Sequence, residues 1–222
     1  MGPMETHALG LDRSRGWQAQ LLPTLRFLEQ LFWMDHHGPT ASPEDARAVA
    51  NHFLGLAHAA GIPLTNLALQ KLVYFAHGLM LSRHGRPLVD GYFEAWDYGP
   101  VHPLLYGAFK GSGRDPISQP AARRDLRTGD VSPVSSSLRP EAADVVSEIF
   151  AKLGRQPAGR LVTLSHAVGG PWEKVVNKNG TATGLGLRIS DTLIFERFHR
   201  HLVAVGSPKE RIGDAVVESP PA

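Results

Sequence analysis

Apolar positions along this 222-residue chain recur at helical spacing in several separate stretches. Between Trp17 and Met34 they fall three and four residues apart, which predicts an amphipathic helix. A second helix is predicted to start at Ser42, a good N-cap, and to end before Pro63. Residues 65–83 follow with hardly any polar face. A helix that is apolar almost all round normally lies at the centre of its domain.

A different pattern follows the central helix. Residues 92–98 are rich in aromatic side chains and alternate between two faces, with Glu94 and Trp96 on the same side, which predicts a short strand. Gly99-Pro100 is expected to turn the chain. Further helices are predicted at residues 103–109, 140–153, 160–167, 171–175 and 191–203. The sequence therefore predicts a mainly α (α+β) fold, a compact helical domain around a central apolar helix with a small β-hairpin or short sheet.

The chain is predicted to have three parts. Residues 1–40 form an N-terminal extension with the first amphipathic helix, residues 41–204 form the helical domain, and residues 205–222 form a flexible tail. Inside the domain, residues 111–138 are rich in Gly, Ser, Pro, Asp and Arg and poor in long apolar side chains. This composition predicts an exposed, irregular excursion with at most a short strand.

Composition narrows the class of protein. Hydrophobic residues make up 42% and charged residues 20%, as in ordinary globular proteins. The absence of cysteine excludes disulfides and thiolate metal sites and favours a reducing cytoplasm. Residues 1–16 lack the pattern of a secretory signal, and the apolar run at residues 72–81 falls short of the ~20 residues that span a bilayer. No membrane partner is expected.

No motif in the sequence requires a catalytic reaction. A Gly-x-Ser-x-Gly elbow is missing, and the neighbours Ser165 and His166 would point apart on a helix. Gly184-Leu185-Gly186 lacks the third glycine of a dinucleotide loop, because Ile189 stands at that position. We therefore expect no enzyme activity and no cofactor.

The 11 histidines leave a metal-dependent hydrolase as one alternative. His36-His37 lie in a predicted loop, and His58 and His77 could approach if their helices pack. His199 and His201 would diverge on one helix. Because a metal site needs several convergent ligands, structural or surface roles are the simpler interpretation, and no metal is expected.

A nucleic-acid-binding regulator is the other alternative. Arg123, Arg124 and Arg127 form a basic cluster that could contact phosphates, but Asp125 and Asp130 dilute it. A net charge of +2 is weak evidence for a nucleic-acid partner, which usually shows as a concentrated patch. A solvated loop is therefore the simpler interpretation.

Two blocks of sequence resemble a known family signature. The first is Leu64-Thr65 followed by LQKLVYFAHG at residues 69–78. The second begins with GRPL at residues 85–88 and continues with FEAWDYGPV at residues 93–101 and Tyr106. A later block, LSH at residues 164–166 with GPW at residues 170–172, resembles a second family signature. Together they are similar to the Panacea domain, also called SocA-like or phage-associated GepA-like.

This resemblance implies a mostly helical domain with a small β element. It also implies a noncatalytic antitoxin, of bacterial or phage type, that binds and neutralises a cognate protein toxin. At least one branch of the family acts as an adaptor that delivers its toxin to an AAA+ protease, so such a protease is a second expected partner. The toxins vary widely, so the resemblance does not name the toxin.

The candidate partner-binding residues come from the two blocks. The aromatic turn supplies residues of the kind that are enriched at interface hot spots. They are Trp96, Tyr98, Pro100, Val101 and Tyr106. The central helix adds a polar seam at i, i+3 and i+6. It consists of Lys71, Tyr74 and His77. Either set could instead serve packing, by holding the strand against the central helix.

Overall fold

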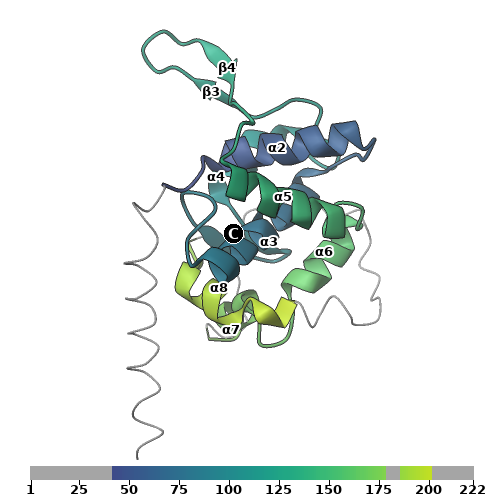
Figure 1. Ribbon diagram of the computed structural model, residues 1–222, viewed down its shortest axis with the longest axis vertical. Coiled ribbons are helices and arrows are strands. Elements are labelled where there is room, and N and C mark those ends of the chain that lie inside the picture. The colour runs from purple at the N-terminus through teal and green to yellow at the C-terminus, as the bar shows by residue number, and fades with distance from the viewer. Residues whose placement is uncertain (1–41, 179–185, 202–222) are drawn as a thin grey trace, which may run out of the picture. The chain divides into compact units, whose positions relative to one another are not determined.

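The structure is a computed structural model that describes residues 42–178 and 186–201 (Figure 1). The helix expected at residues 17–34, the N-terminal extension (residues 1–40) and the tail (residues 205–222) lie outside the described residues. The helices are α2 Ala46–Ala59, α3 Asn66–His84, α4 Pro103–Phe109, the 3₁₀ helix η1 Lys110–Ser112, α5 Pro140–Leu153, α6 Ala158–Ser165, α7 Pro171–Lys178 and α8 Asp191–Arg197. The strands are β1 Phe93–Trp96, β2 Gly99–Val101, β3 Ala122–Arg124, β4 Val131–Pro133 and β5 Arg188–Ile189.

Helix α3 lies at the centre of the domain, and 15 of its 19 residues are buried. The Thr65 side chain caps its start by accepting a hydrogen bond from the Ala68 N–H. At the other end, Gly85 adopts a left-handed conformation and donates its N–H to the Leu81 carbonyl. Helices α2, α5, α6 and α8 all pack against α3. The prediction of a central apolar helix is confirmed.

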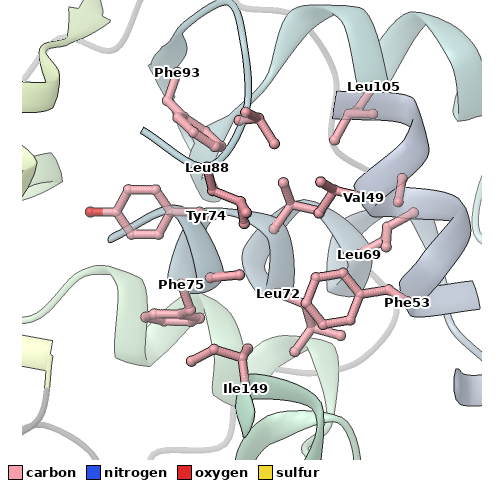
Figure 2. Packing of buried hydrophobic residues seen from close by; sticks show 14 of the residues in the cluster. Val49, Phe53, Leu69, Leu72, Tyr74, Phe75, Leu88, Phe93, Leu105 and Ile149 are labelled. Atoms are coloured by element: carbon pink, nitrogen blue, oxygen red, sulfur yellow. The ribbon is translucent and has the colours of Figure 1, made fainter. Parts of the chain in front are cut away.

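The hydrophobic core forms where these helices meet. Figure 2 shows Val49 and Phe53 of α2, Leu69 and Leu72 of α3, and Ile149 of α5 around one centre. Burying one such side chain fully contributes about 1.5–3 kcal/mol to stability. The core is therefore made chiefly between helices, and the predicted fold class, mainly α with a small β element, is confirmed.

Helix α2 begins later than its sequence predicts, because its N-cap is Asp45 rather than Ser42. The Glu44 N–H donates to the Leu88 carbonyl at 2.8 Å, and the Asp90 N–H donates to the Glu44 carbonyl at 3.0 Å. This pairing holds Glu44 in an extended conformation. The Asp45 carboxylate accepts from the side chain and the N–H of Arg47, and this interaction lowers the Asp45 pKa to about 2.

The predicted strand is the middle strand of a three-stranded antiparallel sheet with the order β2-β1-β5. Glu94 and Trp96 lie on the same face, as expected. The evidence is a hydrogen bond between their side chains, in which Trp96 Nε1 donates to Glu94 Oε2 at 2.8 Å. The prediction of the turn is wrong: Trp96 pairs with Gly99, so Asp97 and Tyr98 turn the chain and Gly99-Pro100 belong to β2. Proline is tolerated there because β2 is an edge strand.

The excursion at residues 111–138 contains more structure than predicted. Strands β3 and β4 pair antiparallel and form a hairpin that extends beyond α2 (Figure 1). Asn51 of α2 holds its base: Nδ2 donates to the carbonyls of Ala121 and Val134, at 3.0 and 2.8 Å, and Oδ1 accepts from the Ala121 N–H at 2.7 Å. Every residue of both strands is exposed. Neither strand has a buried face, so their sequences lack the alternation of apolar and polar residues that would have predicted them.

His201 ties the end of the described chain to the core. Its Nδ1–H donates to the Leu164 carbonyl at 3.0 Å, and its Nε2 accepts from the Tyr74 hydroxyl at 3.0 Å. Burial raises the pKa of Tyr74, which keeps the hydroxyl protonated as a donor, and burial lowers the pKa of His201 to about 4. A neutral imidazole with its proton on Nδ1 satisfies both contacts, and burial favours this neutral form.

Asn51→Ala tests the anchor of the β3–β4 hairpin. The substitution removes three hydrogen bonds and leaves the Ala121 N–H and the Val134 carbonyl without this partner, while the Ala121 carbonyl keeps its bond from the Val134 N–H. We expect the free energy of unfolding to fall by about 2–3 kcal/mol, measured by urea denaturation. The control is His52→Ala on the same helix, whose contact with the Ser136 carbonyl is exposed, and it should cost less than about 1 kcal/mol. An unchanged midpoint for Asn51→Ala would contradict this account.

The neutral state of His201 predicts a loss of stability in mild acid. The unfolded chain binds a proton at His201 near pH 6.5, whereas the folded chain does so only near pH 4. Stability is therefore fully present above pH 6.5 and falls between pH 6.5 and 4, by up to about 3 kcal/mol for this group. His201→Gln should flatten the dependence of the unfolding free energy on pH in that window, and the exposed His199→Gln should not. Equal slopes for wild type and His201→Gln would refute the assignment.

Candidate partner-binding surface

The candidate surface lies at the tip of the β1–β2 hairpin. Asp97 is exposed there and Tyr98 is half-buried. Tyr106 of α4 is also half-buried, and its ring meets the edge of the Trp96 ring at a centroid distance of 4.8 Å. Asp97, Tyr98 and Tyr106 are called the tip surface below. Aromatic side chains that are partly exposed and fixed from behind have the character of interface hot spots.

Gly99 lets the hairpin lie close to two helices. Its φ is +97°, which favours glycine, and a Cβ at this position would lie 2.4 Å from Ser165 Oγ. The same Cβ would lie 3.2 Å from Lys71 Cε and 3.3 Å from His166 Nε2. Both the conformation and the space therefore exclude a side chain here. The strand backbone packs directly against α3 on one hand and the end of α6 on the other.

Lys71 fixes the hairpin from the side of α3. Its side chain is fully buried, and its ammonium group donates a hydrogen bond to the Pro100 carbonyl at 3.0 Å. A buried ammonium group is costly unless polar groups replace its water. The interaction therefore restrains the position of β2 relative to α3.

The later signature block, residues 164–166 and 170–172, holds the hairpin from the other side. Trp172 Nε1 donates to the Trp96 carbonyl at 2.9 Å, and the Trp172 ring stacks on His166 at a centroid distance of 3.7 Å. Burial, and to a lesser degree the nearby charge of Lys71, lowers the His166 pKa to about 4. The ring is therefore neutral in its stack near neutral pH. The first block, through Lys71, and the later block, through His166 and Trp172, therefore both contact the β1–β2 hairpin of the second block.

The remaining seam residues of α3 point into the fold. Tyr74 is fully buried and binds His201. His77 is buried, and its Nε2 lies 3.1 Å from the Asp191 carboxylate at the start of α8. With Lys71, these side chains connect α3 to β2, to the end of the described chain and to α8.

The predicted partner-binding residues thus fall into two groups. Two reach the surface, and they are Tyr98 and Tyr106. The other six are buried, and they are Lys71, Tyr74, His77, Trp96, Pro100 and Val101. The exposed group could meet a partner directly, and the buried group could act on a partner only through the position of the hairpin. Sequence reasoning missed the packing of Ser165 and His166 on Gly99, because the three residues form no local pattern.

The metal alternative finds no support in the described residues. Within residues 42–178 and 186–201, no group of three or more His, Asp or Glu side chains could hold a metal ion. His58 is exposed, whereas His77 is buried beside Asp191. His199 is exposed and His201 is buried, and His36-His37 lie outside the described residues.

The basic cluster lies on the β3–β4 hairpin. All three of its arginines are exposed, and Arg123 forms an ion pair with Asp45 at 3.0 Å.

In the described part of the chain, no helix has both the length and the apolar character needed to cross a membrane.

Comparison with known proteins identifies the family. A family model described as antitoxin SocA-like, Panacea domain, matches residues 69–173, which include α3 from Leu69 onward and the whole β1–β2 hairpin. Antitoxin SocA of Caulobacter vibrioides (strain NA1000 / CB15N) is 46% identical over 178 residues, which cover 80% of this chain and 94% of that protein. No solved structure matches the chain significantly. The chain therefore belongs to the SocA-like antitoxin family, whose domain is the Panacea domain.

Proposed function

We propose that this protein is an antitoxin that binds and neutralises a cognate protein toxin. The observation that carries the proposal is the 46% identity to Antitoxin SocA, which extends over 94% of that protein. The family name points to a noncatalytic regulatory protein, and an antitoxin implies a toxin as its partner. The cysteine-free composition favours the cytoplasm as the place of action.

The toxin binds, in this proposal, at the tip surface. Tyr98 and Tyr106 offer aromatic area to a partner, and Asp97 adds an exposed carboxylate beside them. The hairpin that carries them is held by Lys71 and Trp172, so little conformational freedom remains to be lost on binding. Preorganisation of this kind increases affinity without new contacts.

The six buried candidate residues support binding indirectly. Trp96, for example, donates its indole N–H to Glu94 and its ring packs against Tyr106, so substitution of this side chain would disturb the hairpin tip. Substitution at such a position changes stability and toxin binding together. Substitution at Tyr98 or Tyr106 should change toxin binding with a smaller effect on stability, because both side chains are only half-buried.

A more specific version of the proposal is that the protein neutralises the toxin by delivering it to an AAA+ protease. An adaptor must hold its cargo and its protease at the same time, so it needs two separate surfaces. Simple sequestration needs only the tip surface. The half-life of the toxin distinguishes the two.

A nucleic-acid-binding regulator remains a second candidate with less support. Its observation is the exposed cluster of Arg123, Arg124 and Arg127 on the β3–β4 hairpin. Arg123 is already paired with Asp45, and Asp125 and Asp130 lie on the same hairpin, so the phosphate-binding potential is reduced. The exposed Asp97 carboxylate repels a phosphate backbone, so the tip surface supports a protein partner better than a nucleic acid.

Tyr98→Ala and Tyr106→Ala test the tip surface. We expect each to weaken binding of the cognate toxin by about 10- to 100-fold, which corresponds to about 1.4–2.7 kcal/mol, with the product of the adjacent gene used as the toxin. Binding is measured by calorimetry with the full chain, and growth rescue is measured on co-expression. Tyr92→Ala is the matched control, because this half-buried tyrosine precedes β1 at the end far from the tip and packs under Arg188.

Two results would count against these ideas, in different ways. If the wild-type chain neither relieves growth arrest nor forms a complex on gel filtration, the antitoxin proposal fails. If the wild type binds and both tyrosine variants bind equally well, the toxin docks elsewhere.

Toxin turnover tests the adaptor mechanism. The toxin's half-life should shorten at least severalfold when this chain and the AAA+ protease are both present, and should stay unchanged when either is omitted. The measurement is a chase of toxin level after synthesis is stopped. A half-life that is the same with and without this chain, in cells whose growth is rescued, would leave sequestration as the mechanism.

A further inference from the structure

The tip surface combines side chains from two separate elements. Tyr98 lies in the β1–β2 turn, whereas Tyr106 lies on α4. The pairing of β1 with β2 fixes the register of the hairpin, but it does not fix the tilt of the hairpin relative to the helices. The contact between the Trp96 and Tyr106 rings joins the two elements at one point, and one point leaves rotation about it free. A further contact from outside the sheet must therefore hold the turn for the two tyrosines to form one surface.

The turn is contacted from outside the sheet at both of its ends. At the β1 end, the Trp96 carbonyl accepts a hydrogen bond from Trp172 Nε1 at 2.9 Å. At the β2 end, a Cβ on Gly99 would lie 3.3 Å from His166 Nε2, so the glycine backbone packs directly against the imidazole. Only the two turn residues separate these points along the chain.

One stacked pair of rings makes both contacts. The His166 and Trp172 rings lie 3.7 Å apart between their centroids, at an interplanar angle of 10°. The face of the imidazole therefore lies on the indole, while its edge meets Gly99. This pair of rings is called the His166–Trp172 clamp, and it spans both ends of the turn.

The chain between the two rings is shaped for this stack. Ala167 to Gly170 form a turn, which the Gly170 N–H closes by donating to the Ala167 carbonyl at 2.8 Å. Gly169 in this turn has a φ of +73°, a conformation that favours glycine. Helix α7 starts directly after the turn and brings Trp172 back over His166.

The clamp lies at the edge of the hydrophobic core. His166 and Trp172 are both half-buried, whereas Leu161 and Leu164 of α6 are fully part of the core. Loss of the indole N–H leaves these leucine contacts in place. A substitution in the clamp can therefore change the tilt of the hairpin while the domain stays folded.

We propose that His166 and Trp172 are positioning residues for toxin binding. The clamp holds the β1–β2 turn at the tilt that brings Tyr98 and Tyr106 into one surface, and neither ring of the clamp needs to touch the toxin for this role. The later signature block thereby takes part in toxin binding. This inference rests on the proposed antitoxin function, because that function supplies the partner of the tip surface.

The experiment is calorimetric titration of the full chain with the purified product of the adjacent gene. Trp172→Phe keeps an aromatic ring on His166 but removes the N–H that the Trp96 carbonyl accepts, and we expect it to raise Kd about fivefold or more. In a Tyr98→Ala background the same substitution should raise Kd less than about twofold, because the turn then lacks the tyrosine that the clamp positions.

His166→Ala tests the other ring of the clamp. It removes the ring that lies against the indole, so it should raise Kd about as much as Trp172→Phe. The double variant should raise Kd little further, because both substitutions act through the same contact with Trp96.

Hydrogen exchange of the free chain gives a readout that fold stability alone does not change. Trp172→Phe should speed exchange at residues 97–99 about threefold or more, while exchange in α3 stays as in wild type. Asn51→Ala is the matched control, because it weakens the base of the β3–β4 hairpin and leaves the residues of the clamp and the tip surface unaltered. Its Kd should stay within about twofold of wild type even though its stability is lower.

The outcomes separate this inference from the proposed function. Failure of the wild-type chain to bind the gene product defeats the antitoxin proposal itself. Normal wild-type binding with an unchanged Kd for Trp172→Phe overturns the positioning role alone. An equal rise in Kd in the Tyr98→Ala background, or for Asn51→Ala, overturns it as well, because the effect would then not act through the turn. Circular dichroism melts confirm that each variant is folded, and His166→Ala carries the same test if Trp172→Phe is not.

Discussion

The domain depends on one constraint, which is that α3 is buried along nearly its whole length and its polar side chains must find partners inside the protein. Lys71 donates to the Pro100 carbonyl, Tyr74 to His201, and the Gln70 side-chain oxygen accepts from the His102 N–H at 2.8 Å. Each of these partners lies on a different segment. A single helix therefore fixes the middle of β2, the residue that follows β2 and the end of the described chain through hydrogen bonds that are expensive to break.

The consequence for function is that the family signature is largely an internal framework. The FEAWDYGPV segment places Trp96, Pro100 and Val101 inside, and only Asp97 and Tyr98 at the turn reach the surface. The β1–β2 hairpin lies between Lys71 and the stack of His166 on Trp172, so its tip has a restricted position. A framework of this kind can keep one fold while the exposed residues of the tip surface vary, and in the proposed function those residues meet the toxin.

The sequence predicted the elements whose residue pattern lies within one short segment, namely α3 and β1. Residues 65–83 showed their burial as an absence of polar positions, and α3 is found within one residue of those bounds. The strand at residues 93–96 was predicted from the alternation of side chains between two faces at residues 92–98. The rest depends on contacts distant in sequence: Asp45 replaces Ser42 as N-cap because Glu44 pairs with Leu88, and β5 forms because Ile189 meets Phe93. The β3–β4 hairpin escaped prediction because its strands bury nothing. For the candidate site, residue type located the hairpin, but only the three-dimensional packing separates Tyr98 from its buried neighbours.

In the function proposed above, this chain neutralises its toxin by binding it at a preformed surface on a rigid helical framework. Hydrogen exchange of the full chain, alone and saturated with the neighbouring gene's product, measures this most directly. We expect slower exchange at residues 97–106 in the complex, with α3 already protected in the free chain and little changed. Unchanged exchange at residues 97–106, or a toxin-induced loss of protection in α3, would contradict toxin binding at the tip surface.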